Sequence, residues 1–212
     1  MKKAISFVFM AVIIFSILAG CSSTQEASSN TSSSNKDNFP NKPLNIIVAF
    51  DAGGGTDTTA RTLQPYLEDE LGVTVNIINK PGGSGWVGWN GIANAKPDGY
   101  TIGFLNSPNL ASGLVNPTME KQIDLDKFQT IGNHVADPGA VAIRVDDKRF
   151  SNFEELVEYA KKNEVTTTAT GVAGDDHLVT LKLNEKLGTK FRAIQFEGTA
   201  KSRAAFLGAH VD

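Results

Sequence analysis

The stretch LNIIVAFDAGGGTD, residues 44–57, decides how this chain folds. Its opening run is apolar except for Asn45, and such a run suits a strand that is buried on both faces of a parallel sheet. Three glycines follow, and from Ala60 to Leu71 apolar side chains recur at helical spacing until Gly72 stops the helix. A strand, a glycine loop and a helix in this order form half of a βαβ unit.

The alternation of strands and helices continues through a first lobe, which we assign to residues 43–128. We expect a strand at 73–78, a helix at 86–95 and a strand at 100–105, followed by a looser stretch from 106 to 128. Alternating strands and helices predict a mainly parallel sheet with helices on its faces. Ligands of such sheets bind outside the carboxyl ends of the strands, where the glycine loops lie.

A second lobe, assigned to residues 129–212, repeats the pattern. We expect strands at 129–135, 140–145, 165–169 and 191–196, and helices at 152–162, 176–187 and 200–207. The capping-box pattern Ser151-Asn152-Phe153-Glu154 starts the first of these helices. Its inward side chains should be Phe153, Leu156, Val157 and Ala160. The sequence therefore predicts an α/β protein with two lobes.

The N-terminus has the features of an export signal. Lys2 and Lys3 precede an apolar run from Phe7 to Ala19, and the segment Leu18-Ala19-Gly20-Cys21 resembles the lipobox of bacterial lipoprotein precursors. We interpret residues 1–21 as a signal peptide with Cys21 as the lipidated residue. The alternative is an uncleaved anchor helix, which the run disfavours because it falls short of about 20 residues.

The composition after the signal separates a tether from a folded region. Residues 22–42 are rich in Ser, Thr and Asn and poor in apolar side chains, so we expect a flexible tether there. Cys21 is the only cysteine, and an internal disulfide is therefore excluded. The net charge is −3 and no run of Lys or Arg occurs, so the charge pattern indicates neither nucleic-acid nor membrane-surface binding.

The first glycine loop, Gly53-Gly54-Gly55, is a candidate anion site. Glycines allow successive backbone N–H groups to converge, and the helix that follows adds the positive end of its dipole. A carboxylate can bind there without a basic side chain. Asp57 is most simply the N-cap of this helix, with direct ligand contact as the alternative.

The second glycine loop invites two enzymatic interpretations that its own residues weaken. Gly83, Gly85 and Gly88 fit the G-x-G-x-x-G spacing of dinucleotide-binding folds, but residues 105–107 lack the acidic residue that would hold the ribose. Ser84 could be a nucleophile, but a G-x-S-x-G elbow would need glycine at Trp86. We therefore expect no cofactor and no catalytic residue.

The histidines and the paired acids give little sign of metal or acid–base chemistry. The histidines, His134, His177 and His210, have no metal-ligand spacing, so we expect no metal site. His177 could bond a ligand or the preceding loop, and a purely structural role is the alternative. Asp175 and Asp176 are expected to start a helix rather than to act as an acid–base pair.

Four stretches in the first lobe and three in the second resemble those of one family, the substrate-binding proteins of tripartite tricarboxylate transporters, also called Bug receptors. In the first lobe these stretches are Pro43 to Phe50, the Ala52-Gly53-Gly54 loop with Asp57, Asn79-Lys80-Pro81-Gly82-Gly83-Ser84-Gly85 and Pro97-Asp98-Gly99-Tyr100-Thr101. The third of them resembles the N-R-P-G-x-x-G loop of the family, with Lys80 in place of the usual arginine. In the second lobe they are residues 153–161, 171–178 and 196–212.

The resemblance implies a two-lobed receptor of the periplasmic-binding-protein (Venus flytrap) type that closes on a small di- or tricarboxylate and passes it to a membrane permease. It also implies a monomer that is lipid-anchored on the extracytoplasmic face of the cell membrane. The ligand-binding residues carried over are Phe50, Ala52, Gly53, Gly54, Gly55, Thr56, Asp57, Ser84, Asn106, Ser107, Gly171, Val172, Ala173, Gly174, His177, Phe196, Gly198 and Thr199. From the residues alone, Phe50 and Phe196 are also expected to wall the pocket.

Two departures from the family and two alternative functions accompany this assignment. Asp175 stands where the family commonly has Ser or Thr, and family members continue past residues 207–212. We therefore expect a C-terminally truncated chain whose first-lobe sheet has unpaired edges and which folds poorly alone. The alternatives are an exported hydrolase using Ser84 and His177, and a sensory binding module without a transport role.

Overall fold

The structure is a computed structural model that describes residues 39–116 and 123–212 of the 212-residue chain. The predicted signal peptide, Cys21 and the first part of the predicted tether lie outside the described residues. Residues 40–212 form one compact unit, which contains two separate sheets. Within the described ranges, no helix combines the length and the apolar character that a membrane span needs.

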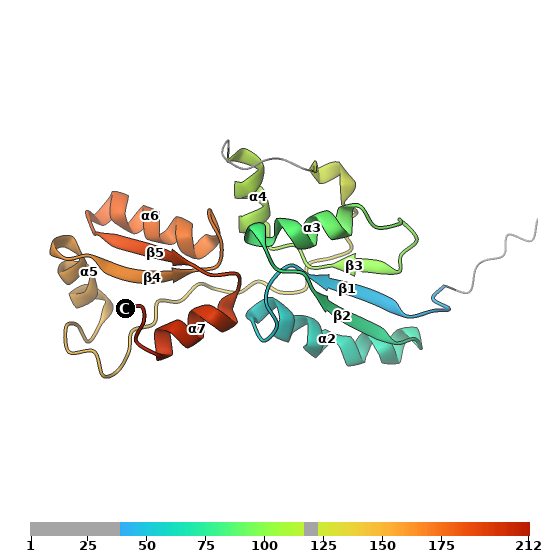
Figure 1. Cartoon of the computed structure of the whole chain (residues 1–212), viewed down its shortest axis with the longest axis horizontal. Helices are drawn as coiled ribbons and strands as arrows, with labels where there is room; N and C mark the ends of the chain where they lie inside the picture. Colours follow the sequence, from blue (N-terminus) through green and yellow to red (C-terminus); the bar gives the residue numbers. More distant parts are fainter. Residues whose placement is uncertain (1–38, 117–122) are drawn as a thin grey trace, which may run out of the picture. The chain divides into compact units, whose positions relative to one another are not determined.

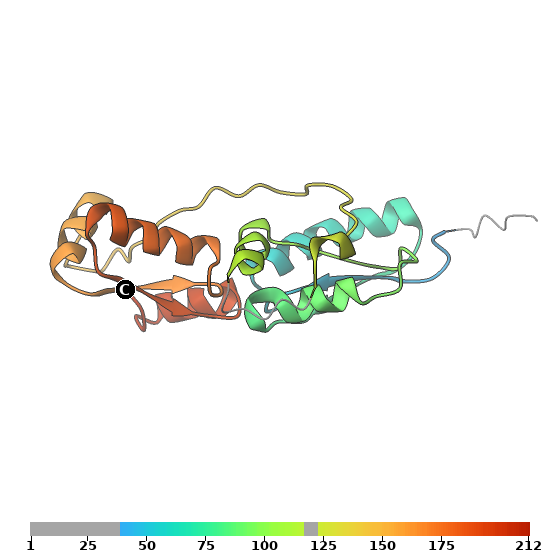
Figure 2. The ribbon, with the colours of Figure 1, turned by 90° about the horizontal axis from the view of Figure 1, so that it is seen from above.

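The first lobe is built on a parallel sheet of three strands in the order β2-β1-β3. The strands are β1 (Leu44–Val48), β2 (Val75–Asn79) and β3 (Thr101–Gly103), and the helices are α2 (Gly55–Leu71), α3 (Trp86–Ala93) and α4 (Ser107–Val115). Ile46 of β1 lies opposite Ile77 on one side and Ile102 on the other. Helices α2 and α3 cover opposite faces of the sheet (Figures 1 and 2). Right-handed crossovers require this, because the connections β1-α2-β2 and β2-α3-β3 run across the sheet in opposite directions.

The central strand explains the continuous apolar run. Ile46 and Val48 point to one face of β1 and Ile47 to the other, and all three are buried because helices cover both faces. Gly88 lets α3 approach the end of this strand, since a Cβ at that position would lie 2.6 Å from the Cα of Ala49. The predicted stop at Gly72 is confirmed, because this residue caps α2 in the left-handed conformation with a φ of 66°.

The end of the predicted tether is attached to the first lobe. The backbone N–H of Asn41 donates to the Tyr100 hydroxyl at 2.9 Å, and that hydroxyl donates to the Asn41 side chain at 2.9 Å. The ammonium group of Lys42 lies 4.0 Å from the centre of the Tyr100 ring. Both residues are exposed, and Tyr100 attaches them to the first lobe.

The second lobe contains a parallel pair of strands and three helices. The strands are β4 (Val165–Ala169) and β5 (Phe191–Gln195), and the helices are α5 (Phe153–Lys162), α6 (Asp175–Leu187) and α7 (Thr199–Leu207). Two short 3-10 turns, η1 (Gly83–Gly85) and η2 (Leu125–Lys127), lie earlier in the chain. The core of this lobe consists of Phe150, Leu156, Ala160, Val165 and Phe191.

The strands predicted at 129–135 and 140–145 are wrong. Both stretches are irregular and belong to neither sheet, and Ile131 and Val145 are 82% and 99% exposed. The apolar alternation suits a strand, but a strand also needs a neighbour to accept and donate its backbone hydrogen bonds. The described part of the chain places no such neighbour beside them. Conversely, the predicted loose stretch at 106–128 contains helix α4.

The start of α5 is displaced by one residue from the predicted capping box. Asn152 is the N-cap and its side chain accepts the N–H of Glu155 at 2.9 Å, while the Glu155 carboxylate accepts the N–H of Ser151 at 2.8 Å. The predicted inward position of Phe153 is also wrong, because its side chain is exposed. The other three predicted inward side chains of this helix are buried.

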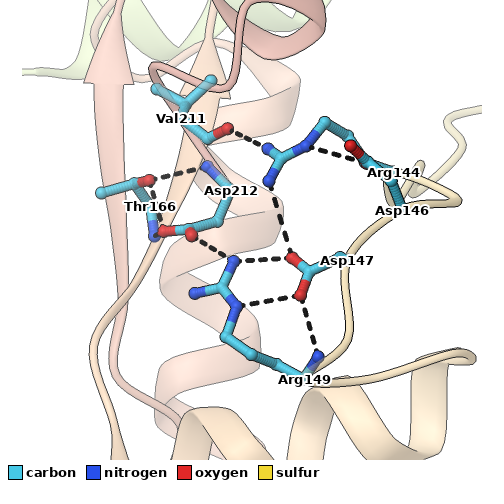
Figure 3. A network of polar contacts seen from close by, with 7 residues as sticks. All are labelled: Arg144, Asp146, Asp147, Arg149, Thr166, Val211 and Asp212. Atoms are coloured by element: carbon cyan, nitrogen blue, oxygen red, sulfur yellow. Dashed lines mark hydrogen bonds and ion pairs between the residues drawn. The ribbon is translucent and has the colours of Figure 1, made fainter.

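A network of charged side chains ties Asp212 to the start of β4 (Figure 3). The Asp212 carboxylate accepts the N–H of Thr166 at 2.9 Å and pairs with the guanidinium of Arg149. Arg149 also donates to both oxygens of Asp147, at 3.0 and 2.6 Å. Arg144 donates to the carbonyl oxygen of Val211 at 2.8 Å. The irregular segment before α5 is therefore fastened to the sheet by ion pairs.

Replacing Asp147→Asn should flatten the acid sensitivity of folding. The hydrogen bonds from Arg149 lower the pKa of Asp147 from 3.8 to about 2. The folded protein therefore takes up this proton later than the unfolded chain, so the stabilisation is complete above pH 4 and is lost as the pH falls to 2. We expect the variant to lose about 1–3 kcal/mol at pH 7 and to show a shallower decline below pH 4 in urea unfolding.

Asp146→Asn is the matched control, because Asp146 pairs with Arg144 at 3.5 Å but its side chain is largely exposed. The dependence of its unfolding free energy on pH should follow that of the unmodified protein. Parallel profiles for all three proteins would contradict the prediction.

Candidate functional site

The loops that carry the predicted site residues all follow the carboxyl ends of strands. In the first lobe these loops are residues 49–54, 80–82 and 104–106, which follow β1, β2 and β3. In the second lobe they are residues 170–174 and 196–198, which follow β4 and β5. Because parallel strands end at the same edge of a sheet, each lobe gathers its loops at one edge.

The first glycine loop is positioned by Asp57, but not as predicted. Gly54 occupies the N-cap of α2, and Asp57 lies in the first turn, where its carboxylate accepts the N–H of Gly53 at 2.8 Å. The N-cap interpretation is therefore wrong, because the carboxylate reaches back to the loop instead of capping the helix. The N–H of Gly53 already has an acceptor, so the free donors of this loop are those of the helix start, Gly55 and Thr56.

Asp57 remains ionised although it is buried. Burial raises its pKa, but hydrogen bonds from Arg61, from the backbone of Gly53 and from Asn79 outweigh burial, and the resulting pKa is lower than the ordinary 3.8. The guanidinium Nε of Arg61 donates to the carboxylate at 2.9 Å and the amide of Asn79 donates at 3.0 Å. The first glycine loop is therefore held by the ionised Asp57 carboxylate, whose negative charge is balanced by the guanidinium of Arg61.

Two predicted site residues of the first lobe come together. The side-chain amide of Asn106 donates to the hydroxyl of Thr56 at 3.2 Å. Asn106 is the N-cap residue of α4, and Thr56 lies in the first turn of α2. The starts of these two helices are therefore adjacent.

The first glycine loop also meets the loop that follows β5. The N–H of Asp51 donates to the carbonyl oxygen of Glu197 at 3.3 Å, and the ammonium group of Lys201 lies 2.8 Å from the Asp51 carboxylate. A Cβ on Gly54 would lie 3.5 Å from the backbone nitrogen of Thr199, the first residue of α7. The starts of α2 and α7 therefore lie close together.

The second glycine loop meets the loop that follows β4. The hydroxyl of Ser84 accepts the N–H of Val172 at 3.0 Å, and Ser84 adopts a left-handed φ of 58°. Gly171, with a φ of 113°, packs against it so closely that a Cβ would lie 2.8 Å from the Cβ of Ser84. Ser84 and Gly171, which were predicted as site residues from separate motifs, are therefore in contact.

Sequence reasoning missed two side chains of α4 that hold the loop at 170–174. The amide of Asn109 donates to the carbonyl oxygen of Thr170 at 3.2 Å, and the hydroxyl of Ser112 donates to the carbonyl oxygen of Ala173. The signal that could have found them is Pro108, because proline is favoured in the first turn of a helix.

The loop at 170–174 is fastened to the helix that follows it. His177 accepts the N–H of Ala173 on Nδ1 at 2.9 Å, and Asp176 accepts the N–H of Thr170 at 2.8 Å. A hydrogen bond of His177 to the loop, which the sequence suggested, is therefore present. Burial raises the pKa of Asp176. Asp175 is the exposed first residue of α6, and the predicted helix-start role of both acids is confirmed.

The two side chains that a hydrolase would use both contact the loop at 170–174. Ser84 and His177 each accept a backbone N–H of the loop between them, and no hydrogen bond joins their side chains in the described part of the chain. Across residues 39–116 and 123–212, no group of three or more His, Cys, Asp or Glu residues could hold a metal ion.

The remaining predicted site residues differ in their exposure. Phe50 is buried against Trp89, with ring centres 6.3 Å apart, whereas Phe196 is half-buried and donates its N–H to the carbonyl oxygen of Ala169 at 2.8 Å. Gly174 and Gly198 are buried. The exposed positions are Ala52, Gly53, Gly55, Ser107, Val172 and Thr199.

Both lobes have a parallel sheet with helix starts at its carboxyl edge, an α/β architecture that solved periplasmic binding proteins share. Residues 59–212 match the tripartite tricarboxylate transporter family receptor, and the chain belongs to that family. A UPF0065 protein of Bordetella pertussis is 31% identical over 189 residues, 85% of this chain and 56% of its own length. A UPF0065 protein of Bordetella bronchiseptica is 30% identical, over 82% of this chain and 51% of its own length.

Solved structures show the same fold. The periplasmic binding protein BugD is 31% identical with a TM-score of 0.64, over 82% of this chain and 58% of that protein. MatC from Rhodopseudomonas palustris, solved with bound malate, is 22% identical with a TM-score of 0.64, over 82% of this chain and 60% of its own. The chain thus spans little more than half the length of the relatives it matches.

The contact between Gly171 and Ser84 predicts a specific pattern of destabilisation. Gly171→Ala should reduce the free energy of unfolding by about 2–4 kcal/mol, because it combines a strained φ with a clash. Gly188→Ala is the control, since Gly188 also has a positive φ, of 69°, but open space around it, and should cost about 1 kcal/mol.

Adding Ser84→Gly to Gly171→Ala should recover part of the loss in urea unfolding, because it removes the side chain that the new methyl group would strike. Equal losses for the two glycine substitutions, without recovery in the double variant, would contradict the contact.

Proposed function

We propose that this chain is an extracytoplasmic solute receptor that binds a small organic carboxylate at the carboxyl edges of its sheets. The observation that carries the proposal is the convergence of helix starts: Thr56 of α2 contacts the N-cap of α4, and Gly54 lies against the start of α7. Each helix start offers backbone N–H groups and the positive end of a dipole. An anion is the ligand that such an arrangement favours.

The chemistry of the ligand follows from the kind of donors. Backbone N–H groups suit carboxylate oxygens, which accept several short hydrogen bonds at once. The solved relatives support a small dicarboxylate, since MatC holds malate and another Rhodopseudomonas palustris protein, 20% identical with a TM-score of 0.65, was solved with adipate. A di- or tricarboxylate held by the loops of both lobes is therefore the proposed ligand.

The N-terminal features and the family support a role in uptake. We propose that Cys21 carries the lipid anchor, that the segment after it is a tether, and that the monomeric receptor delivers its ligand to the membrane permease of a tripartite system. A binding role needs no nucleophile, which agrees with the loop contacts of Ser84 and His177.

The contribution of one backbone N–H donor to binding can be tested at Gly55. This residue is the first of α2, and the preceding Gly54 has the extended conformation, with a ψ of 175°, that proline requires before it. Gly55→Pro removes one N–H donor and keeps the helix start, whereas Gly55→Ala keeps the donor in the same open space. We expect the proline variant alone to weaken binding of malate or citrate by about fivefold or more.

Binding is measured by calorimetry and by thermal unfolding with malate, adipate and citrate, using glucose as an uncharged control. A ligand at 100 times its Kd stabilises the folded state by about 2.7 kcal/mol and raises the Tm. The proposal fails if none of the three carboxylates raises the Tm. Equal affinities of the proline and alanine variants would exclude the Gly55 amide as a donor.

A further inference from the structure

Three side chains below the first glycine loop form a connected unit that the proposed ligand would not touch. The side chain of Asp57 is 3% exposed, and it lies beneath Gly53, which is exposed. Arg61 and Asn79 both bond to it, at 2.9 and 3.0 Å. The carboxylate therefore faces its own partners rather than the surface on which the helix starts converge.

The same unit joins the two glycine loops. Asn79 is the last residue of β2 and precedes the second glycine loop, and its amide also donates to the carbonyl oxygen of Phe50 at 3.1 Å. Arg61 closes the ring by donating from Nη2 to the side-chain oxygen of Asn79 at 3.2 Å. These side chains therefore link the end of β2 to the loop after β1 and to the start of α2, in addition to the backbone hydrogen bonds between β1 and β2.

The chemistry of the unit requires an acid at position 57. Gly53, Arg61 and Asn79 all present N–H donors to it, and only a carboxylate has acceptors for all three. An asparagine there would turn an NH₂ group toward one of these donors and leave it unsatisfied. A negative charge beside an anion site weakens that site, so its presence calls for a compensating role, and Arg61 supplies the neutralising charge.

We propose that Asp57, Arg61 and Asn79 form a positioning unit, which sets the spacing of the two glycine loops and thereby the direction of the amide donors at the carboxylate site. The unit acts through Gly53 and through the end of β2, without contact to the ligand. This inference rests on the proposed carboxylate-binding function.

The first test measures the affinity for malate by calorimetry at 10 °C, well below unfolding. We compare the unmodified chain with Asp57→Asn and Arg61→Gln. The Kd should rise about fivefold or more in both variants, because each leaves a buried hydrogen-bonding group unsatisfied and releases the loop. A purely structural role would lower the Tm and leave the Kd of the folded protein at this temperature unchanged.

Arg192→Gln is the matched control. Arg192 donates from Nε to Glu164 at 2.7 Å and is 55% exposed, against 48% for Arg61, but it lies on β5, away from the glycine loops. Its Kd should equal that of the unmodified chain. A rise of the same size in all three variants would overturn the proposal, as would an unchanged Kd in Asp57→Asn.

The second test does not depend on a ligand. Amide hydrogen exchange, followed by NMR in the ligand-free chain, should show a protected Gly53 amide that loses protection at least tenfold in Asp57→Asn and is unchanged in Arg192→Gln. If malate fails to bind but this protection is lost, the unit positions the loop and only the choice of ligand is wrong. Retained protection in Asp57→Asn overturns the unit whatever malate does.

Discussion

The first backbone N–H groups of a helix have no partner inside that helix, and the structure around the site depends on this constraint. Helices α2, α4, α6 and α7 all begin just beyond the carboxyl ends of parallel strands. Parallel strands place those ends at one edge of each sheet, so the unsatisfied donors gather there. The same geometry that builds a βαβ unit therefore supplies a surface suited to an anion.

In each lobe an acid in the first turn of a helix holds the loop that precedes that helix. Asp57 accepts the N–H of Gly53 and Asp176 accepts that of Thr170, and Asp176 also accepts the N–H of His177 in the first turn of α6 at 2.9 Å. The two acids differ in their electrostatics. Hydrogen bonds, above all that from Arg61, lower the pKa of Asp57, whereas burial raises that of Asp176.

Where the sequence prediction succeeded, the signal was local. An apolar run located β1, β-branched residues located β4, and the helical spacing with Gly72 located α2. Where it failed, the deciding partner was distant. The strand pattern at 129–145 has no neighbouring strand in the described residues, and α4, whose apolar spacing is weak, is fixed by contacts such as that of Asn109 with Thr170. By contrast, the N-cap prediction for Asp57 failed for a local reason, because Gly54 is the N-cap and the carboxylate bonds Gly53 and Arg61, each four residues away.

By itself, the sequence determined the alternation of strands and helices, the glycine loops at the strand ends and the family, because these follow from composition and spacing along the chain. Only the tertiary structure decided which loops meet. That Ser84 bonds Val172 and that Asn106 bonds Thr56 depends on the order β2-β1-β3 and on helix packing. Hydrogen bonds across such separations require the backbone to be folded first, and no local pattern records them.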